Sequence, residues 1–207
     1  MGGFWLPFLD AYLEPVDFRG IVGGMYHSGN QLIDPHLLFD KTRLSPGMHI
    51  ADFGCGRTGH IVFPGAMVVG ERGVVYAVDI LKSVLEEVDK RAKMENLTHV
   101  HTIWSDLEKV GKTAIPSETL DTVFIINMLY HTKDHTIVCD EAKRLLKNKA
   151  RIVVVDWIKN GLPFGPTQEQ FVNFGSIREW AQREDFAIQE EFPMGQYHWG
   201  IILYRHI

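Results

Sequence analysis

The stretch ADFGCGRTGH, at residues 51–60, contains residue types that bind nucleotides. Gly54, Gly56 and Gly59 follow the G-x-G-x-x-G spacing that is typical of a dinucleotide-binding loop. The first two of these glycines let the backbone turn sharply and approach a ligand closely, because no Cβ intervenes. Asp52 stands just before them, close to where a pyrophosphate would have to lie. The sequence therefore leaves two classes of nucleotide to distinguish, those with phosphates and those without.

Two further acids follow apolar runs. Asp79 closes VVYAVD, where a carboxylate can accept two hydrogen bonds from a ribose diol. Asp106, after Ser105, adds a polar point suited to an adenine amino group. Asp52 separates the two ligand classes, because it repels a pyrophosphate in a poorly solvated crevice, whereas S-adenosylmethionine carries an ammonium, a sulfonium and no phosphate. These acids favour S-adenosylmethionine. A nicotinamide-dependent oxidoreductase stays as the alternative that the literal glycine spacing supports.

The elements around these residues alternate between two patterns. Continuous apolar runs predict strands, and apolar positions at helical spacing predict helices between them. The predicted strands are 49–53, 74–79, 100–104, 121–126 and 151–157, and the predicted helices are roughly 60–69, 81–96 and 137–146. Strands of this kind predict a parallel sheet buried on both faces and doubly wound. After a helix around 176–185, two strands at 187–192 and 198–204 are close enough in sequence to form only an antiparallel hairpin.

The first 45 residues differ from this pattern. They are apolar and aromatic but interrupted by prolines. We predict an N-terminal cap or lid over residues 1–45, with Tyr26 and His27 as candidate lid residues, and a single catalytic domain over residues 46–207.

The composition excludes several function classes. The 207 residues carry a formal net charge of −5, which disfavours nucleic acid as a partner. The two cysteines form no C-x-x-C pair, and no metal site is expected, since His131 and His135 lack the glutamate of an H-E-x-x-H motif. No apolar run is long enough to span a membrane and no secretory signal is evident, so we expect a cytoplasmic protein.

Longer stretches carry a family resemblance. They are PGMHIADFGCG, GVVYAVD, WSDLE, LDTVFIINMLYH, AKRLLKNKARIVVVDW and YHWGIILYR. Over about residues 32–207 the chain resembles a class I S-adenosylmethionine-dependent methyltransferase of the small type 11 kind, related to quinone-biosynthesis methyltransferases. The resemblance implies a Rossmann-like, seven-stranded, mostly parallel sheet with an antiparallel C-terminal hairpin. It also implies that S-adenosylmethionine is the cofactor and S-adenosylhomocysteine the product.

The resemblance assigns eight residues to the cofactor. The methionine part is assigned to Asp52, Gly54 and Gly56, the ribose to Asp79, the adenine amino group to Asp106 and the methionine end to Asn127. Ile80 and Leu107 are two further cofactor-binding residues. The loop departs from the family's G-C-G-[ST]-G, since Arg57 and Thr58 lengthen it by one residue. Which of Arg57, Thr58 and Gly59 contacts the cofactor therefore stays open.

The acceptor side has two catalytic candidates, each with an ordinary structural alternative. His131 follows the fourth strand, where it is a candidate general base or a helix-start histidine. Asp156 ends the fifth strand, where it orients an acceptor, acts as a base or caps a neighbouring segment. The predicted function is methyl transfer to a small-molecule acceptor, with a homodimer as a candidate assembly. A binding module that retains the cofactor fold without catalysis is the third alternative.

Overall fold

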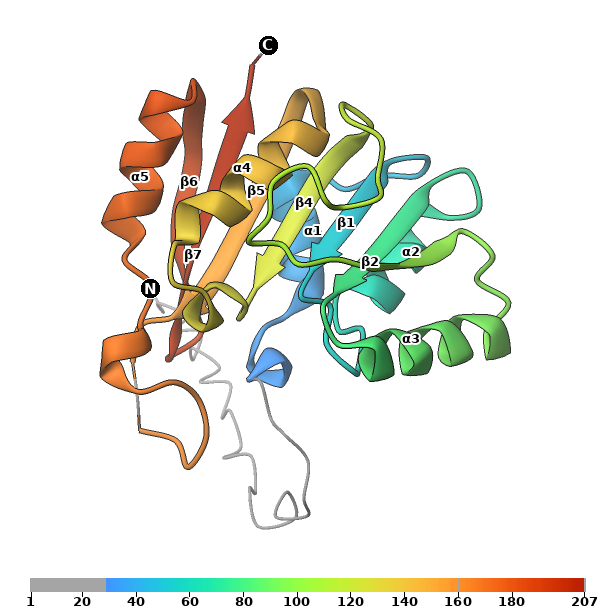
Figure 1. The fold of residues 1–207 in the computed structure, drawn as a ribbon, viewed down its shortest axis with the longest axis horizontal. Helices are drawn as coiled ribbons and strands as arrows, with labels where there is room; N and C mark the ends of the chain where they lie inside the picture. Colours follow the sequence, from blue (N-terminus) through green and yellow to red (C-terminus); the bar gives the residue numbers. More distant parts are fainter. Residues whose placement is uncertain (1–28, 160, 207) are drawn as a thin grey trace, which may run out of the picture.

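The computed structural model describes residues 29–159 and 161–206, and its strands form one sheet (Figure 1). Seven strands follow the order β3-β2-β1-β4-β5-β7-β6. Their bounds are β1 His49–Phe53, β2 Val74–Asp79, β3 Val100–Trp104, β4 Leu120–Ile126, β5 Leu146–Trp157, β6 Phe186–Met194 and β7 His198–Arg205. The first five strands pair in parallel, whereas β7 is antiparallel to both β5 and β6. This confirms the predicted fold class, including the C-terminal hairpin.

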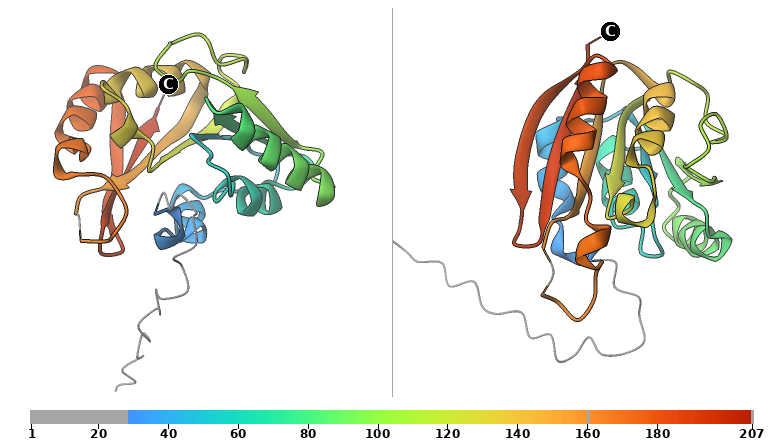
Figure 2. Two further views of the ribbon diagram at one scale, coloured as in Figure 1. Left: turned by 60° about the horizontal axis from the view of Figure 1, so that its bottom comes forward. Right: turned by 60° about the vertical axis from the view of Figure 1, so that its left-hand side comes forward.

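Helices cover both faces of the sheet. Their bounds are α1 Pro35–Thr42, α2 Val62–Val69, α3 Lys82–Met94, α4 His135–Leu145 and α5 Phe174–Arg183, with short 3-10 turns η2 Asn30–Leu32, η3 Leu129–His131 and η4 Gln168–Gln170. Figure 2 shows α4 and α5 on one side of the sheet, and α1, α2 and α3 on the other. Each side has its own cluster of buried apolar side chains. The central strands are therefore apolar on both faces, as a parallel sheet between two helical layers requires.

Two elements differ from the sequence-based expectation. β5 begins at Leu146 rather than at residue 151, because Leu120 pairs with Leu146 before a register shift in the ladder. The described part of the predicted cap contains the helix α1, which Asp34 caps by accepting a hydrogen bond from the His36 backbone N–H at 2.9 Å. Phe39 of α1 is buried in the apolar cluster on the side of the sheet that α1, α2 and α3 cover. Tyr26 and His27 lie outside the described residues.

The strand order fixes where a ligand can bind. From β1 the chain winds outward to β2 and β3, and it then returns to β4 on the other side of β1. In such sheets the crevice opens beyond the carboxyl ends of the strands at this reversal. The carboxyl ends of β1, β2, β4 and β5 carry Asp52, Asp79, Asn127 and Asp156 at or next to that crevice.

Candidate cofactor and acceptor site

Two buried carboxylates lie where β1 and β2 end. Only 3% of Asp52 and 8% of Asp79 is exposed. Burial, together with the smaller effect of the Asp79 charge, raises the pKa of Asp52 to about 8. Such a pair is stabilised by a cation placed beside it and destabilised by an anion. The electrostatics of this edge therefore suit a positively charged ligand.

The glycine loop is fixed to the end of β2 by its backbone. The amides of Gly54 and Cys55 donate to the Val78 carbonyl at 2.8 and 3.0 Å, and the amide of Gly56 donates to Asp79 Oδ2 at 3.1 Å. A Cβ on Gly54, at φ 74°, would lie 2.7 Å from Met128 Cγ. A Cβ on Gly56, at φ 62°, would meet nothing within 4 Å. Gly54 is thus required by packing, whereas Gly56 leaves open space where a ligand can approach the backbone.

The longer part of the loop turns toward α3. The Arg57 guanidinium forms an ion pair with Glu87 on that helix. Arg91, also on α3, donates to the Thr58 carbonyl at 3.2 Å and stacks on the Phe63 ring at 3.8 Å. The additional residue of the loop therefore serves contacts with this helix, and the side chain of Arg57 points to α3 rather than to the carboxylate pair.

The predicted adenine end lies beyond β2 and β3. Asp106 is half-buried and forms an ion pair with Lys109 at 2.9 Å, and the hydrogen bond from Lys109 lowers the pKa of Asp106. Leu107 is buried, whereas Ile80 is 53% exposed. Trp104 is equally exposed, and its indole Nε1 donates to the Ile80 carbonyl at 2.8 Å. Trp104 therefore lies at the surface, next to Ile80.

Asn127 follows β4 and links two distant segments. Its backbone lies in the left-handed region at φ 50°, and its amide donates to the Val155 carbonyl at 2.8 Å. Its side-chain Nδ2 donates to Asn30 Oδ1 at 2.9 Å, across 97 positions of sequence. Sequence reasoning did not find Asn30, because nothing local in the sequence indicates this pairing.

His131 and Tyr130 lie together in the η3 turn. Their rings are in contact, with centroids 3.9 Å apart and planes tilted by 35°. Partial burial of the His131 ring lowers its pKa, and the negative charge of Asp79 opposes this shift. A lowered pKa keeps the imidazole neutral at pH 7, which is the state that accepts a proton. His131 is exposed, so a ligand in solution can reach its ring.

Asp156 lies inside the protein, beneath that turn. Its Oδ2 accepts hydrogen bonds from the amides of Leu129 and Tyr130, at 3.0 and 3.4 Å, and its Oδ1 accepts one from the amide of Trp157 at 2.8 Å. Burial raises the pKa of Asp156 to about 7, although these donors oppose the shift. With 0% exposure, the carboxyl supports the turn that carries His131, as in the capping alternative.

Trp157 and His198 form a buried pair that sequence reasoning did not assign. They face each other across the β5–β7 ladder with ring centroids 4.2 Å apart, and each is 1% exposed. Within the part of the chain that the structure describes, Trp157 Nε1 and both ring nitrogens of His198 have no hydrogen-bond partner. Burial lowers the pKa of His198 to about 4, so the ring is neutral. The pair joins β5 to β7 rather than the two strands of the predicted hairpin, and no pattern in the sequence predicts its burial.

Metal ligation and cysteine chemistry find no support in the described residues. Among residues 29–159 and 161–206, no group of three His, Cys, Asp or Glu side chains is placed to hold a metal ion. Cys55 and Cys139 are both free and buried. Burial raises the pKa of each thiol, which disfavours the reactive thiolate.

Comparisons with known proteins agree with this geometry. A family described as "methyltransferase domain" matches residues 44–194, more than half of the chain. The aklanonic acid methyltransferase DauC of Streptomyces sp. (strain C5) is 34% identical over 86 residues, which are 42% of this chain and 37% of that enzyme. A highly reducing polyketide synthase, ltbA of Aspergillus luteorubrus, is 22% identical over 87% of this chain. The chain spans only 37% and 6% of the lengths of these two curated relatives.

Solved structures show the same fold. A SAM-dependent methyltransferase from Aquifex aeolicus superposes with a TM-score of 0.74 at 22% identity, covering 86% of this chain and 93% of that one. The [4+2]-cyclase SpnF superposes with a TM-score of 0.69 at 14% identity, covering 86% and 82%. Identities this low establish the fold alone.

The residues also fit the predicted cofactor. The buried acids Asp52 and Asp79 suit its cationic amino-acid end, and the open space at Gly56 permits close approach to the loop. The match to the family covers both features, and it removes the support for the oxidoreductase alternative, which rested on the glycine spacing alone. The chain belongs to the methyltransferase-domain family, and its cofactor is S-adenosylmethionine.

Proposed function

We propose that this domain transfers the methyl group of S-adenosylmethionine to a small-molecule acceptor. The observation that carries the proposal is the pair of buried carboxylates, Asp52 and Asp79, beside a glycine loop. That pair favours a cationic cofactor over a phosphate-bearing one. DauC, by its name a methyltransferase of aklanonic acid, supports an acceptor of small-molecule size.

Each end of the cofactor has a proposed partner in this chain. Asp52 and the backbone at Gly56 hold the amino-acid end, with Gly54 shaping the turn and Asn127 bordering it. Asp79, beside Ile80, holds the ribose diol. Asp106 accepts from the adenine amino group, and Leu107 packs against the ring. When bound, S-adenosylmethionine supplies a methyl group activated by its sulfonium.

The remaining work of the protein is to align the acceptor and exclude water, which lowers the entropic part of the barrier. We propose His131 as the group that takes a proton from an acceptor hydroxyl, enol or acidic carbon. Its pKa is lowered, which favours the neutral ring, and the residue is exposed just after the carboxyl end of β4. We propose Asp156 as a positioning residue, because its carboxyl holds the turn that carries His131.

The same proposal covers partners and location. A net charge of −5 supports a small molecule rather than nucleic acid as the acceptor. We infer a cytoplasmic enzyme, with a homodimer as its candidate assembly. Separately, none of the helices in the described part of the chain combines the length and apolar character needed to cross a bilayer.

The experiment uses S-adenosylmethionine labelled on its methyl group. The full chain is incubated with phenols, aromatic hydroxy acids and β-dicarbonyl compounds, and separately with RNA, DNA and unfolded protein. We expect label in at least one small molecule, and less label with Asp79→Ala at a cofactor concentration that does not saturate the variant. Label transferred only to a macromolecule would contradict the proposed acceptor class. Cofactor binding without transfer to any acceptor would favour the non-catalytic alternative.

A further inference from the structure

The segment between β3 and β4, residues 105–119, carries two of the proposed adenine-binding residues, Asp106 and Leu107. It contains no helix or strand of its own. Neither a sheet ladder nor helical hydrogen bonds can therefore hold it in one shape. Its conformation depends on contacts with the rest of the protein.

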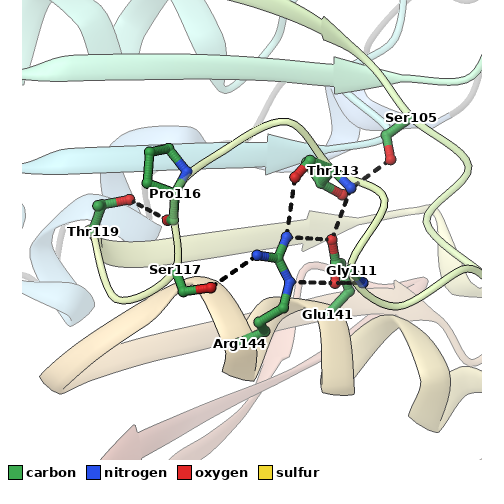
Figure 3. A network of polar contacts seen from close by, with 8 residues as sticks. All are labelled: Ser105, Gly111, Thr113, Pro116, Ser117, Thr119, Glu141 and Arg144. Atoms are coloured by element: carbon green, nitrogen blue, oxygen red, sulfur yellow. Dashed lines mark hydrogen bonds and ion pairs between the residues drawn. The ribbon is translucent and has the colours of Figure 1, made fainter.

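Leu107 and Ile115 of this segment are buried in the apolar core, and Glu141, on α4, supplies a polar contact (Figure 3). The carboxylate accepts hydrogen bonds from the backbone amides of Gly111 and Thr113 at 2.6 and 3.0 Å. The side chain is fully buried, with 0% exposure. A side chain from α4 thus accepts hydrogen bonds from two backbone amides of the segment 105–119.

Arg144 completes the arrangement one helical turn later. Its Nε and Nη2 donate to the two carboxylate oxygens of Glu141 at 2.9 and 2.8 Å, in a bidentate pair. Nη2 also donates to the Thr113 carbonyl at 3.0 Å, and Nη1 donates to Ser117 Oγ at 3.0 Å. Burial alone would raise the pKa of Glu141, but the donors around it outweigh burial and lower that pKa to about 2. The carboxylate is therefore ionised throughout the neutral range and fully hydrogen-bonded, the condition under which a buried charge is tolerated.

A contact between two hydroxyl groups connects Thr113, which Glu141 holds, to Ser105 at the start of the segment 105–119. Thr113 Oγ1 lies 3.0 Å from Ser105 Oγ, and both side chains are buried. The amide of Ser105 donates to the Asp79 carbonyl at 3.1 Å. Residues 105–113 are consequently closed at both ends, with Asp106 and Leu107 inside the closed segment.

We propose that Glu141 is a positioning residue for the adenine end of the cofactor, acting through Thr113 and Ser105 on Asp106. The proposal rests on the proposed function, which assigns the adenine amino group to Asp106. Glu141 itself touches no part of the cofactor in this account. It fixes the conformation of the segment 105–119. That conformation determines the difference in affinity between an adenine-containing ligand and one with another base.

The test is calorimetric titration with two probes, S-adenosylhomocysteine and S-inosylhomocysteine, in which a carbonyl oxygen replaces the adenine amino group. We expect Asp106→Ala to weaken S-adenosylhomocysteine about tenfold, the loss of one charge-assisted hydrogen bond, and to leave S-inosylhomocysteine within about twofold. Glu141→Gln is expected to weaken S-adenosylhomocysteine about fivefold, again with little effect on the other probe. In the Asp106→Ala background, Glu141→Gln is expected to change nothing further, because coupled residues are not additive.

A variant with a smaller structural change and a matched control are titrated beside Asp106→Ala and Glu141→Gln. Thr113→Val removes the hydroxyl contact with Ser105 but keeps the backbone bonds to Glu141, and we expect the same selectivity at a smaller size. Glu184→Gln removes another glutamate that pairs with α4, through Lys143 at 2.7 Å, and should leave both affinities unchanged. Equal weakening of the two probes by Glu141→Gln and Thr113→Val, or additive effects with Asp106→Ala, would overturn the positioning role. An unchanged affinity of Asp106→Ala for S-adenosylhomocysteine would instead overturn the adenine assignment beneath it.

Discussion

The two halves of the sheet build their sites in different ways. In the half containing β1, β2 and β3, each polar group stands next to the loop that it fixes, as with Asp79 and the Gly56 amide at 3.1 Å. In the half containing β4, β5 and β7, contacts also join groups that are distant in the sequence. Asn127 contacts Asn30 over 97 positions, and Trp157 faces His198 from another strand.

This difference has a physical origin. A nucleoside has the same shape in every protein, and short loops at the ends of neighbouring strands suffice to contact it. An acceptor needs a pocket of its own shape, and such pockets are assembled from loops that are distant in sequence. The cofactor half is therefore expected to respond to mutation mainly in binding, and the acceptor half mainly in stability or catalysis.

The largest expected effect belongs to the acceptor half. Asp156→Ala removes the acceptor of three backbone amides, two in buried hydrogen bonds and one in a partly buried bond, and leaving a buried donor unpaired costs roughly 1–3 kcal/mol. We expect the free energy of unfolding to fall by about 3 kcal/mol or more in urea denaturation. Asp134→Ala removes a carboxylate that caps α4 at an exposed position, and should cost only about 1 kcal/mol. Equal losses would show that burial of Asp156 contributes nothing.

Asp79→Ala tests the cofactor half. We expect S-adenosylhomocysteine to bind more weakly by roughly 1.5–3 kcal/mol, the range for hydrogen bonds that involve a charged group. Calorimetric titration of the folded variant measures this directly. Asp89→Ala, on the exposed side of α3, provides a control whose affinity should match the wild type. Wild-type affinity in Asp79→Ala would refute the ribose assignment.

A smaller effect is expected from pH. The pKa of Asp52 is raised to about 8 by burial and by the charge of Asp79, so Asp52 is largely protonated in the free protein at pH 7. A bound ammonium favours the ionised form, so binding releases a proton and affinity rises with pH until Asp52 is ionised in the free protein as well. The gain is at most about tenfold per pH unit below pH 8.

Titrations at pH 6, 7 and 8, in two buffers with different ionisation enthalpies, measure the affinity and count the released protons. Asp52→Asn should remove the pH dependence over this range. A flat wild-type profile would mean that Asp52 is not coupled to the ligand's charge.

The smallest expected effect sharpens the boundary between the two halves. His131→Ala should leave the affinity for S-adenosylhomocysteine within about 0.5 kcal/mol, the usual range for a substitution without a specific contact, and should slow methyl transfer to any acceptor that must lose a proton. If cofactor affinity collapses instead, His131 belongs to the cofactor site.

The same contrast explains what the sequence could predict. β1, β2 and β3 begin and end where the sequence predicted them. In β1 and β2 the reason is that a buried parallel strand is marked by a nearly continuous apolar run, whereas β3 is a partly exposed edge strand with fewer apolar residues. The placement of Asp52, Asp79 and Asp106 at strand ends follows from those boundaries. The Asn30–Asn127 bond and the pairing of Glu141 with Gly111 and Thr113 depend on tertiary contacts, which no local pattern specifies. The early start of β5 was missed because Lys147, Asn148 and Lys149 look like a turn. They lie in the irregular stretch between the pairs Leu120–Leu146 and Thr122–Arg151, and Lys149 has a φ of 60°.

The central claim is that the buried acids select a phosphate-free adenosyl cofactor that carries an ammonium group. It is tested most directly by thermal unfolding with S-adenosylhomocysteine, S-adenosylmethionine or NADH added. A ligand at about 100 times its dissociation constant contributes roughly 2.7 kcal/mol, which for a domain of this size raises the melting temperature by roughly 5–10 °C. We predict that rise with both adenosyl sulfur compounds and none with NADH. A rise with NADH alone would contradict the claim, and it would mean that the glycine spacing had indicated the ligand correctly.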